Sequence, residues 1–191
     1  MKVFNIPFRE VLIPLYEGDY KRKILKFSPA GKVPALQHGK TTVWDSLAIA
    51  EFLAELFPQK HLWPRDKAAR AMARSVAAEM HSGFMPLRKN CPMDVRAYKP
   101  QKNFSPDVST DMERIRTIWE SCRRKFGRGG EFLFGKFSIA DAMFAPVVWR
   151  FNTYGGPLTG SAERYQASML QLPAMQEWKA AAEKEPWTIV H

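Results

Sequence analysis

The sequence predicts a two-part chain, with a small α/β domain over residues 1–58 followed by an all-helical domain over residues 65–191. In the first sixty residues, short apolar runs rich in β-branched residues alternate with amphipathic stretches. Beyond residue 66, apolar residues recur at the three- and four-residue spacing of helices. A stretch with proline at both ends, residues 58–64, is typical of a linker, and its Trp63 is expected to be exposed.

The first domain is expected to contain a strand, a helix, two short strands and a second helix, over residues 8–15, 17–27, 33–37, 41–44 and 46–57. Residues 8–15 (FREVLIPL) have the apolar, β-branched composition of a buried strand. His38-Gly39-Lys40, with glycine at its centre, predicts a hairpin turn between the two short strands. Asp45 and Ser46 are residue types that begin helices, so the last helix is expected to start there.

The second domain is expected to be helical throughout. Apolar periodicity predicts helices over residues 66–85 and 107–125, and residues 126–137 form a glycine-rich loop. Ser138-Ile139-Ala140-Asp141 matches a capping box, in which the first and fourth residues each bond the other's backbone N–H. The apolar run behind it predicts a buried helix, and Pro173 opens a last helix that extends through Ala182.

The composition limits the classes of function that the chain can have. The 191 residues carry a formal net charge of +10, which attracts anionic substrates as well as nucleic acid, but no nucleic-acid-binding motif accompanies the basic runs. Cys91 and Cys122 are far apart and form no metal-ligand pattern, so we expect reduced thiols and no metal. No secretory signal or membrane-spanning apolar run is visible, and the protein is expected to be soluble and cytoplasmic.

Four motifs in register resemble glutathione transferases. They are Gly31-Lys32-Val33-Pro34-Ala35-Leu36, Trp44-Asp45-Ser46-Leu47-Ala48-Ile49, the Ser138–Asp141 capping box, and Leu172-Pro173 before Trp178. Their order and spacing fit the family along essentially the whole chain, and residues 78–84 (AEMHSGF) look like its bacterial, zeta-like branch. The resemblance implies a thioredoxin-like glutathione-binding domain, a helical second domain, a homodimer and a role in detoxification, with glutathione as co-substrate.

The resemblance also implies a set of glutathione-binding residues. A cis Val33-Pro34 bond would leave an extended Val33 to pair with the cysteinyl unit, although a structural turn proline is a compatible reading. Asp45 would accept the γ-glutamyl ammonium, and Ser46 would donate to its carboxylate at a helix N-terminus. The alternative is that these two residues only cap the helix. Lys32 would reach the glycine carboxylate or remain a solvated loop lysine.

The acceptor substrate is expected against the long helix, where Met80 and Phe84 would form an apolar wall. Each of these two side chains, taken singly, is more often a core or dimer-interface residue. Ser138 and Asp141 are expected to be structural.

The catalytic residue is left unassigned. Members of the family begin with a strand and a loop that holds a Ser, Tyr or Cys, whereas Met1–Pro7 corresponds to the end of the helix that follows that loop. The first strand and the catalytic loop thus have no counterpart in these residues. Three explanations stay open: the segment exists but lies outside this sequence, the start codon is misassigned, or the chain is truncated. The first two are favoured, because the missing strand is a central one in this sheet and its loss would expose the edge of a neighbouring strand.

The leading hypothesis is an enzyme that activates the glutathione thiol for addition to an electrophilic, apolar acceptor. A glutathione-dependent cis–trans isomerase of the zeta kind is a close variant, because it uses the same thiolate. The alternative from another class is a non-catalytic interaction protein of the same fold, which the positive charge favours and the intact Val33-Pro34 and Asp45-Ser46 pairs disfavour.

Overall fold

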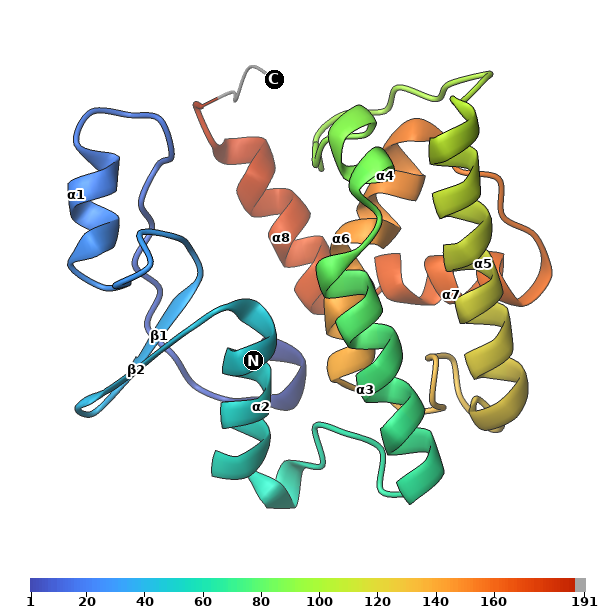
Figure 1. Ribbon diagram of the computed structural model, residues 1–191, viewed down its shortest axis with the longest axis horizontal. Coiled ribbons are helices and arrows are strands. Elements are labelled where there is room, and N and C mark those ends of the chain that lie inside the picture. Colours follow the sequence, from blue (N-terminus) through green and yellow to red (C-terminus); the bar gives the residue numbers. More distant parts are fainter. Residues whose placement is uncertain (188–191) are drawn as a thin grey trace. The chain divides into compact units, whose positions relative to one another are not determined.

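The computed structural model describes residues 1–187 (Figure 1), and its contacts divide the chain into two compact units. The N-terminal unit contains Met1–Leu62 together with the described residues from Glu185 onward. The helical unit contains Trp63–Lys184. The predicted α/β region and helical region are thus both present.

The N-terminal unit contains a two-stranded sheet, two α-helices and two single 3₁₀ turns. In chain order these are η1 (Lys2–Phe4), α1 (Tyr20–Leu25), β1 (Ala35–His38), β2 (Thr41–Trp44), α2 (Ser46–Leu56) and η2 (Pro58–Lys60). The strands pair antiparallel, with Ala35 opposite Trp44 and His38 opposite Thr41. The turn between them places Gly39 at a φ of 59°, a conformation that glycine adopts without steric cost. The predicted hairpin and the predicted helix after it are therefore confirmed.

The strand predicted over residues 8–15 does not form. The segment belongs to no helix or strand, and residues 7–18 make no backbone–backbone hydrogen bond to any other described residue. A strand is stabilised by its ladder of hydrogen bonds to a neighbour, and apolar composition alone does not supply that neighbour. The expected burial is also wrong, because Val11 is 53% and Leu12 is 60% exposed.

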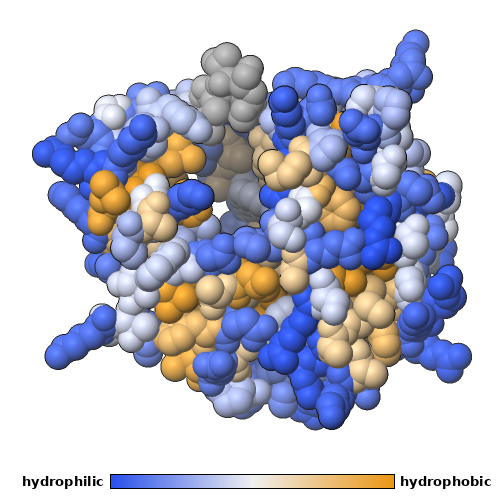
Figure 2. All heavy atoms as spheres, in the orientation of Figure 1, coloured by the Kyte–Doolittle hydropathy of each residue, from blue (hydrophilic) through white to orange (hydrophobic). Residues whose placement is uncertain are grey.

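Other large apolar side chains of the N-terminal unit are exposed as well. Leu25 of α1 and Trp44 of β2 are 58% and 45% exposed. Figure 2 shows hydrophobic residues gathered over α2. The N-terminal unit therefore exposes several large apolar side chains among its described residues.

The helical unit contains α3 (Lys67–Ser82), α4 (Met85–Asn90), α5 (Pro106–Phe126), α6 (Ile139–Tyr154), α7 (Gly160–Leu170) and α8 (Pro173–Lys184). The predicted helices are all present, with α3 ending three residues earlier than expected. The short helices α4 and α7 were not predicted. The core is formed by aromatic residues, where the Trp119 ring lies 4.9 Å from the ring of Tyr165 and 5.9 Å from that of Phe144, centroid to centroid.

Trp63 is buried, which corrects the expectation that it is exposed. Only 6% of its surface is accessible, and the guanidinium carbon of Arg74 lies 5.7 Å from its ring centroid. A tryptophan with a cation over its face gains both apolar burial and a cation–π interaction. The buried Trp63 therefore fixes the end of the linker to the start of the helical unit.

The predicted capping box at the start of α6 is confirmed. Asp141 is fully buried, and its Oδ2 accepts hydrogen bonds from the backbone N–H of Ser138 at 2.8 Å and from the Ser138 hydroxyl at 2.9 Å. Its Oδ1 accepts a third hydrogen bond from the backbone N–H of Leu133 at 3.0 Å. The carboxylate thus fixes both the helix start and the loop before it.

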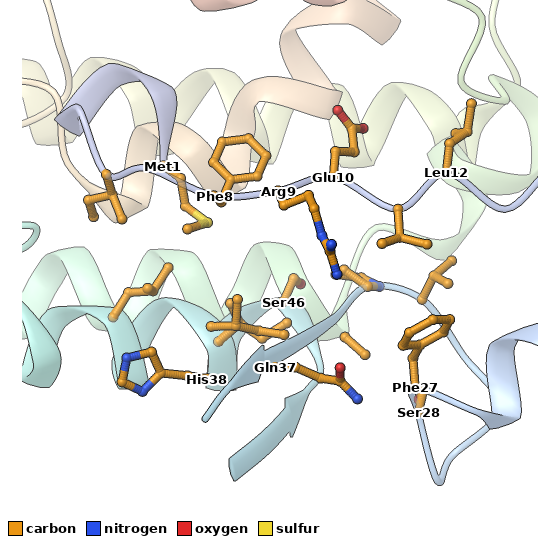
Figure 3. Close-up of a pocket in the computed structure, with 18 of the residues that line it drawn as sticks. Met1, Phe8, Arg9, Glu10, Leu12, Phe27, Ser28, Gln37, His38 and Ser46 are labelled. Carbon is orange, nitrogen blue, oxygen red and sulfur yellow. The ribbon is translucent and has the colours of Figure 1, made fainter. Parts of the chain in front are cut away.

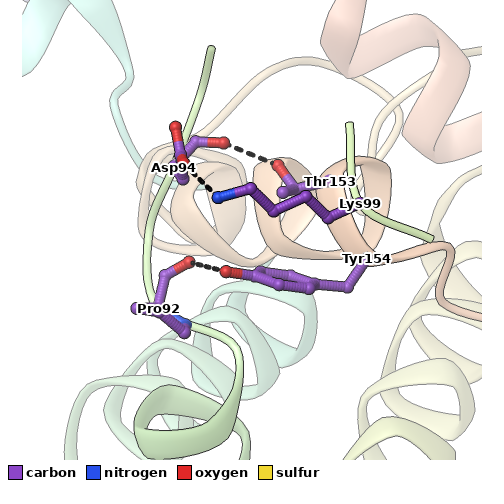
Figure 4. Close-up of polar contacts among 5 residues, drawn as sticks. All are labelled: Pro92, Asp94, Lys99, Thr153 and Tyr154. Atoms are coloured by element: carbon purple, nitrogen blue, oxygen red, sulfur yellow. Dashed lines mark hydrogen bonds and ion pairs between the residues drawn. The ribbon is translucent and has the colours of Figure 1, made fainter. Parts of the chain in front are cut away.

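The segment between α4 and α5 is fastened to the end of α6 by polar contacts (Figure 4). The Tyr154 hydroxyl donates to the carbonyl of Pro92 at 3.0 Å, and the Thr153 hydroxyl donates to the carbonyl of Asp94 at 2.8 Å. Lys99 forms an ion pair with Asp94 at 3.1 Å. These contacts hold an irregular segment in place without secondary structure of its own.

Candidate functional site

The start of α2 carries the two residues that the sequence singles out for an anionic ligand. Asp45 is the N-cap, and its Oδ1 accepts hydrogen bonds from the backbone N–H groups of Leu47 at 2.9 Å and Ala48 at 3.3 Å. The Oδ1 atom of Asp45 therefore caps the helix, as the capping interpretation predicted. Ser46 is the first residue of the helix, so its N–H has no acceptor within the helix.

The backbone of Asp45 has an unusual conformation, with φ at 75° and ψ at 131°. A positive φ costs a residue with a Cβ of the order of 1–3 kcal/mol, and such residues cluster at functional sites. Asparagine and glycine would tolerate this φ better than most residues. The strained position thus lies at the base of the predicted ligand site.

Val33 precedes β1 with its backbone unpaired. The Val33–Pro34 peptide bond is cis, as predicted, and the Val33 side chain is 50% exposed. Neither the N–H nor the C=O of Val33 makes a backbone–backbone hydrogen bond within residues 1–187. Both groups are therefore available to a ligand. Lys32 beside it is exposed.

A cleft of about 660 Å³ brings several of these residues together (Figure 3). Val33, Pro34 and Ser46 all line it. Asp45 adjoins Ser46 without lining the cleft, and Lys32 adjoins Val33 in the same way. The structure therefore places three of the five predicted glutathione-binding residues on one cleft and the other two directly beside it.

Part of the lining was not predicted as a site. The segment of residues 6–13 lines one side of the cleft, and Figure 3 shows the Arg9 side chain directed into it. Sequence reasoning assigned this segment to a buried strand, so its residues were not considered as surface groups. No sequence motif around Arg9 indicates that its side chain lines a cleft.

Met80 and Phe84 lie in the helical unit, and neither lines this cleft. Their exposed fractions are 5% and 9%, and the Met80 sulfur accepts a hydrogen bond from Arg88 at 3.3 Å. This degree of burial agrees with the alternative prediction, that Met80 and Phe84 are core side chains and not the wall of an acceptor pocket.

The two cysteines are not placed to act as nucleophiles. Burial raises the pKa of the Cys91 thiol, against the opposing effect of Arg150, and raises the pKa of Cys122 to about 12. A thiol with a raised pKa holds little thiolate at neutral pH. Within the described residues, no group of three His, Cys, Asp or Glu side chains is arranged to hold a metal ion, and no helix has the length and apolarity to span a membrane.

Comparison with known proteins agrees with these features. Residues 1–56 match the glutathione S-transferase N-terminal domain model, and residues 95–181 match the C-terminal domain model. A probable maleylacetoacetate isomerase of Caenorhabditis elegans is 34% identical over 177 residues, which are 89% of this chain and 80% of the relative. Glutathione S-transferase 1 of Dianthus caryophyllus is 29% identical over 148 residues, which are 75% of this chain and 66% of the relative.

A solved structure supports the same assignment. A glutathione transferase homologue from Burkholderia, crystallised with bound glutathione, superposes with a TM-score of 0.69 and 26% identity, covering 96% of this chain and 88% of that one. Two domain models in order, a relative above 30% identity and a shared fold together show that the chain belongs to the glutathione S-transferase family.

Proposed function

We propose that the chain binds glutathione at the cleft between β1 and α2 and serves as a glutathione transferase. The observation that carries this proposal is the start of α2, where Asp45 has a strained backbone and the helix-opening Ser46 lines the same cleft as Val33, whose backbone is unpaired. A helix N-terminus is a ready-made site for a carboxylate, and an acidic residue beside it suits an ammonium group. Glutathione carries both groups at its γ-glutamyl end.

The role of each residue follows from its chemistry. The Asp45 carboxylate pairs with the γ-glutamyl ammonium, while the Ser46 hydroxyl and N–H donate to the γ-glutamyl carboxylate. The Val33 N–H and C=O pair with the cysteinyl unit in the manner of an added strand. Lys32, exposed beside Val33, supplies a positive charge for the glycine carboxylate.

The proposed reaction is addition of the glutathione thiolate to an electrophilic, apolar acceptor. Binding orients the thiol and holds it near the acceptor, which converts a bimolecular reaction into an effectively unimolecular one. Stabilising the thiolate against the neutral thiol raises the nucleophile concentration at neutral pH. Met80 and Phe84 are not given a part in this step, because both are buried in the helical unit.

A second candidate is a glutathione-dependent cis–trans isomerase. The specific observation in its favour is the 34% identity to a probable maleylacetoacetate isomerase. The net charge of +10 also suits an acidic substrate. Reversible addition of the same thiolate to a double bond would allow rotation before glutathione leaves, so the glutathione site is shared by both candidates.

The test is calorimetric titration of glutathione into the full chain and into Asp45→Asn. Asparagine caps helices about as well as aspartate, so this change removes the charge while it preserves the cap. We expect a loss of affinity of about tenfold or more, equivalent to about 1.4 kcal/mol. Asp66→Asn is the matched control, because Asp66 caps α3 through Ala69 at 2.8 Å in the helical unit and should leave affinity unchanged.

Equal loss in both variants would show that the effect is one of general stability, and unchanged affinity in Asp45→Asn would refute the site. Turnover then separates the candidates. Conjugation of a panel of electrophiles supports the transferase, whereas isomerisation of maleylacetoacetate without net glutathione consumption supports the isomerase. Glutathione binding with neither activity would support the non-catalytic alternative.

A further inference from the structure

Two arginines of the helical unit carry positive charges that no acidic side chain among the described residues offsets. Arg88 lies on α4 and Arg150 lies on α6, and both are half-buried. Their hydrogen bonds within the described residues go to backbone carbonyls and to methionine sulfurs. Cations that are withdrawn from water are usually paired with a carboxylate, because an unpaired charge is costly to desolvate. These two residues therefore depart from the usual arrangement.

The guanidinium of Arg88 is fixed at the end of α3. Its Nε donates to the carbonyl of Gly83 at 2.9 Å, and its Nη2 donates to the carbonyl of Met80 at 2.5 Å. Basic side chains commonly bond the last carbonyls of a helix in this way. The remaining nitrogen, Nη1, donates to no described residue, and it is not among the enclosed polar atoms that lack a partner. One NH₂ group of Arg88 is therefore open to solvent.

The guanidinium of Arg150 is fixed in the same manner, at the end of α4. Its Nε donates to the carbonyl of Cys91 at 3.0 Å, and its Nη1 donates to the carbonyl of Pro146 at 3.2 Å and lies 4.0 Å from the sulfur of Met93. Its Nη2 donates to no described residue and is not enclosed. Because Cys91 directly follows α4, Arg150 caps the helix that carries Arg88. Each arginine is thus held by its neighbours and keeps one NH₂ group for a ligand.

The two guanidinium groups also repel each other. Burial lowers the pKa of Arg150, and the charge of Arg88 lowers it further. The groups that oppose this shift are the Cys91 thiol and the Tyr154 phenol. Burial raises the pKa of both, so both are neutral at pH 7 and offset neither positive charge. A bound anion would relieve the repulsion.

The surroundings favour an organic anion over an inorganic one. Asp94, on the segment after α4, is already paired with Lys99 at 3.1 Å (Figure 4). Met93 is half-buried beside Arg150, and its thioether is suited to contact with a carbon chain and offers no hydrogen-bond donor to a hydrated ion. Phe84, which begins α4, has a φ of 61°, and strained positions of this kind cluster at functional sites.

We propose that Arg88 and Arg150 form an anion site of the helical unit that binds the carboxylate of a small organic acid. The free Nη1 of Arg88 and the free Nη2 of Arg150 donate to the carboxylate oxygens in charge-assisted hydrogen bonds. The carbon chain of the acid packs beside Met93. The site lies within the helical unit and does not depend on glutathione binding in the N-terminal unit.

The test is a nuclear magnetic resonance titration of the full chain with succinate at constant ionic strength, read at the assigned arginine Nε–H signals. We expect the signals of Arg88 and Arg150 to shift and to saturate in the millimolar range or below, as suits so small a ligand. The exposed Arg124 supplies an internal reference, because its signal reports only the general attraction of anions to a chain of charge +10. Phosphate and chloride are titrated in parallel.

Charge-conserving variants give a second measurement. Arg88→Lys and Arg150→Lys keep the positive charge but lose the guanidinium fork, so each should weaken succinate binding by about tenfold or more. Arg124→Lys is the matched control, since it makes the same change at an exposed position of α5 and should leave binding unchanged. Circular dichroism checks that the variants fold. If Arg88→Lys or Arg150→Lys does not fold, the signals of the unaltered chain decide, because arginines that only cap helices would not respond to succinate.

Shifts that do not saturate, or that are as large at Arg124 as at Arg88 and Arg150, would overturn the proposed site. Saturation by phosphate at a lower concentration than by succinate would overturn the assignment to a carboxylate. Because the titration contains no glutathione, failure here and failure of glutathione binding are separate results.

Discussion

Replacement of Asp141 by asparagine is the sharpest test of how the helical unit is held together. The carboxylate is fully buried and accepts three hydrogen bonds, two from Ser138 and one from Leu133. Asparagine has nearly the same shape but keeps only one acceptor oxygen, and its NH₂ group presents donors to groups that already donate. The change therefore alters the chemistry of the site with little change in its volume.

The magnitude follows from these contacts. If the amide oxygen keeps the Leu133 N–H, the Ser138 N–H loses its acceptor, while the Ser138 hydroxyl can rotate and accept. The losses are one hydrogen bond to a charged group, worth about 1.5–3 kcal/mol, and the desolvation of an unpaired buried N–H, worth about 1–3 kcal/mol. At pH 7 asparagine also avoids the cost of about 3 kcal/mol of burying an ionised carboxylate whose pKa is raised to about 6, so we expect the free energy of unfolding to fall by a net amount of about 1–3 kcal/mol.

Urea unfolding followed by circular dichroism measures this loss. Asp107→Asn is the matched control, because Asp107 lies in the first turn of α5 and is exposed. Neutralising it should cost about 0.3–1 kcal/mol through the helix dipole alone. A loss in Asp141→Asn no larger than that of the control would refute the argument that the buried carboxylate fixes the start of α6.

Three further predictions concern the same unit. Burial raises the pKa of Asp141 from 3.8 to about 6, although its hydrogen bonds oppose the shift, so the native state binds the proton more tightly than the unfolded state. The free energy of unfolding should therefore fall by about 2 kcal/mol between pH 4 and pH 7 through this group, and urea titrations of Asp141→Asn should lack that slope. Cys91 and Cys122 should not react with a chromogenic disulfide at pH 8 until urea unfolds the chain, because both thiols are buried and their pKa values are raised; reaction of the native protein would contradict this. Gly156→Ala should lower stability by about 1–3 kcal/mol, since its Cβ would lie 2.3 Å from the buried ring of Phe151; an unchanged melting temperature would show that the ring moves aside.

The helical unit was predictable because each long helix carries its own signal. In α5, the buried residues Met112, Ile115, Ile118 and Trp119 follow the three- and four-residue spacing that marks one helix face. The capping box of α6 needs only residues within one turn. The short helix α4 has six residues and a proline in its first turn, which is too little periodicity to distinguish from a loop.

The candidate site was partly predictable for a similar reason. Asp45, Ser46 and Pro34 are local signals, since a cap and a turn proline depend on neighbours in sequence. What the sequence could not supply is the burial of Trp63. This residue lies in a polar linker, and the side chain that packs over its ring, Arg74, is eleven residues further along the chain. Tertiary packing of this kind leaves no mark in the local pattern.

Residues 8–15 show the limit most clearly. Their composition is that of a buried strand, yet in the structure they are unpaired and largely exposed along one side of an apolar cleft. Composition reports which environment a segment suits, and a strand forms only when a neighbour supplies the other half of its hydrogen bonds. For residues 8–15 the apolar composition can be read from the sequence, whereas the absence of a hydrogen-bonded neighbour within the described residues can be read only from the structure.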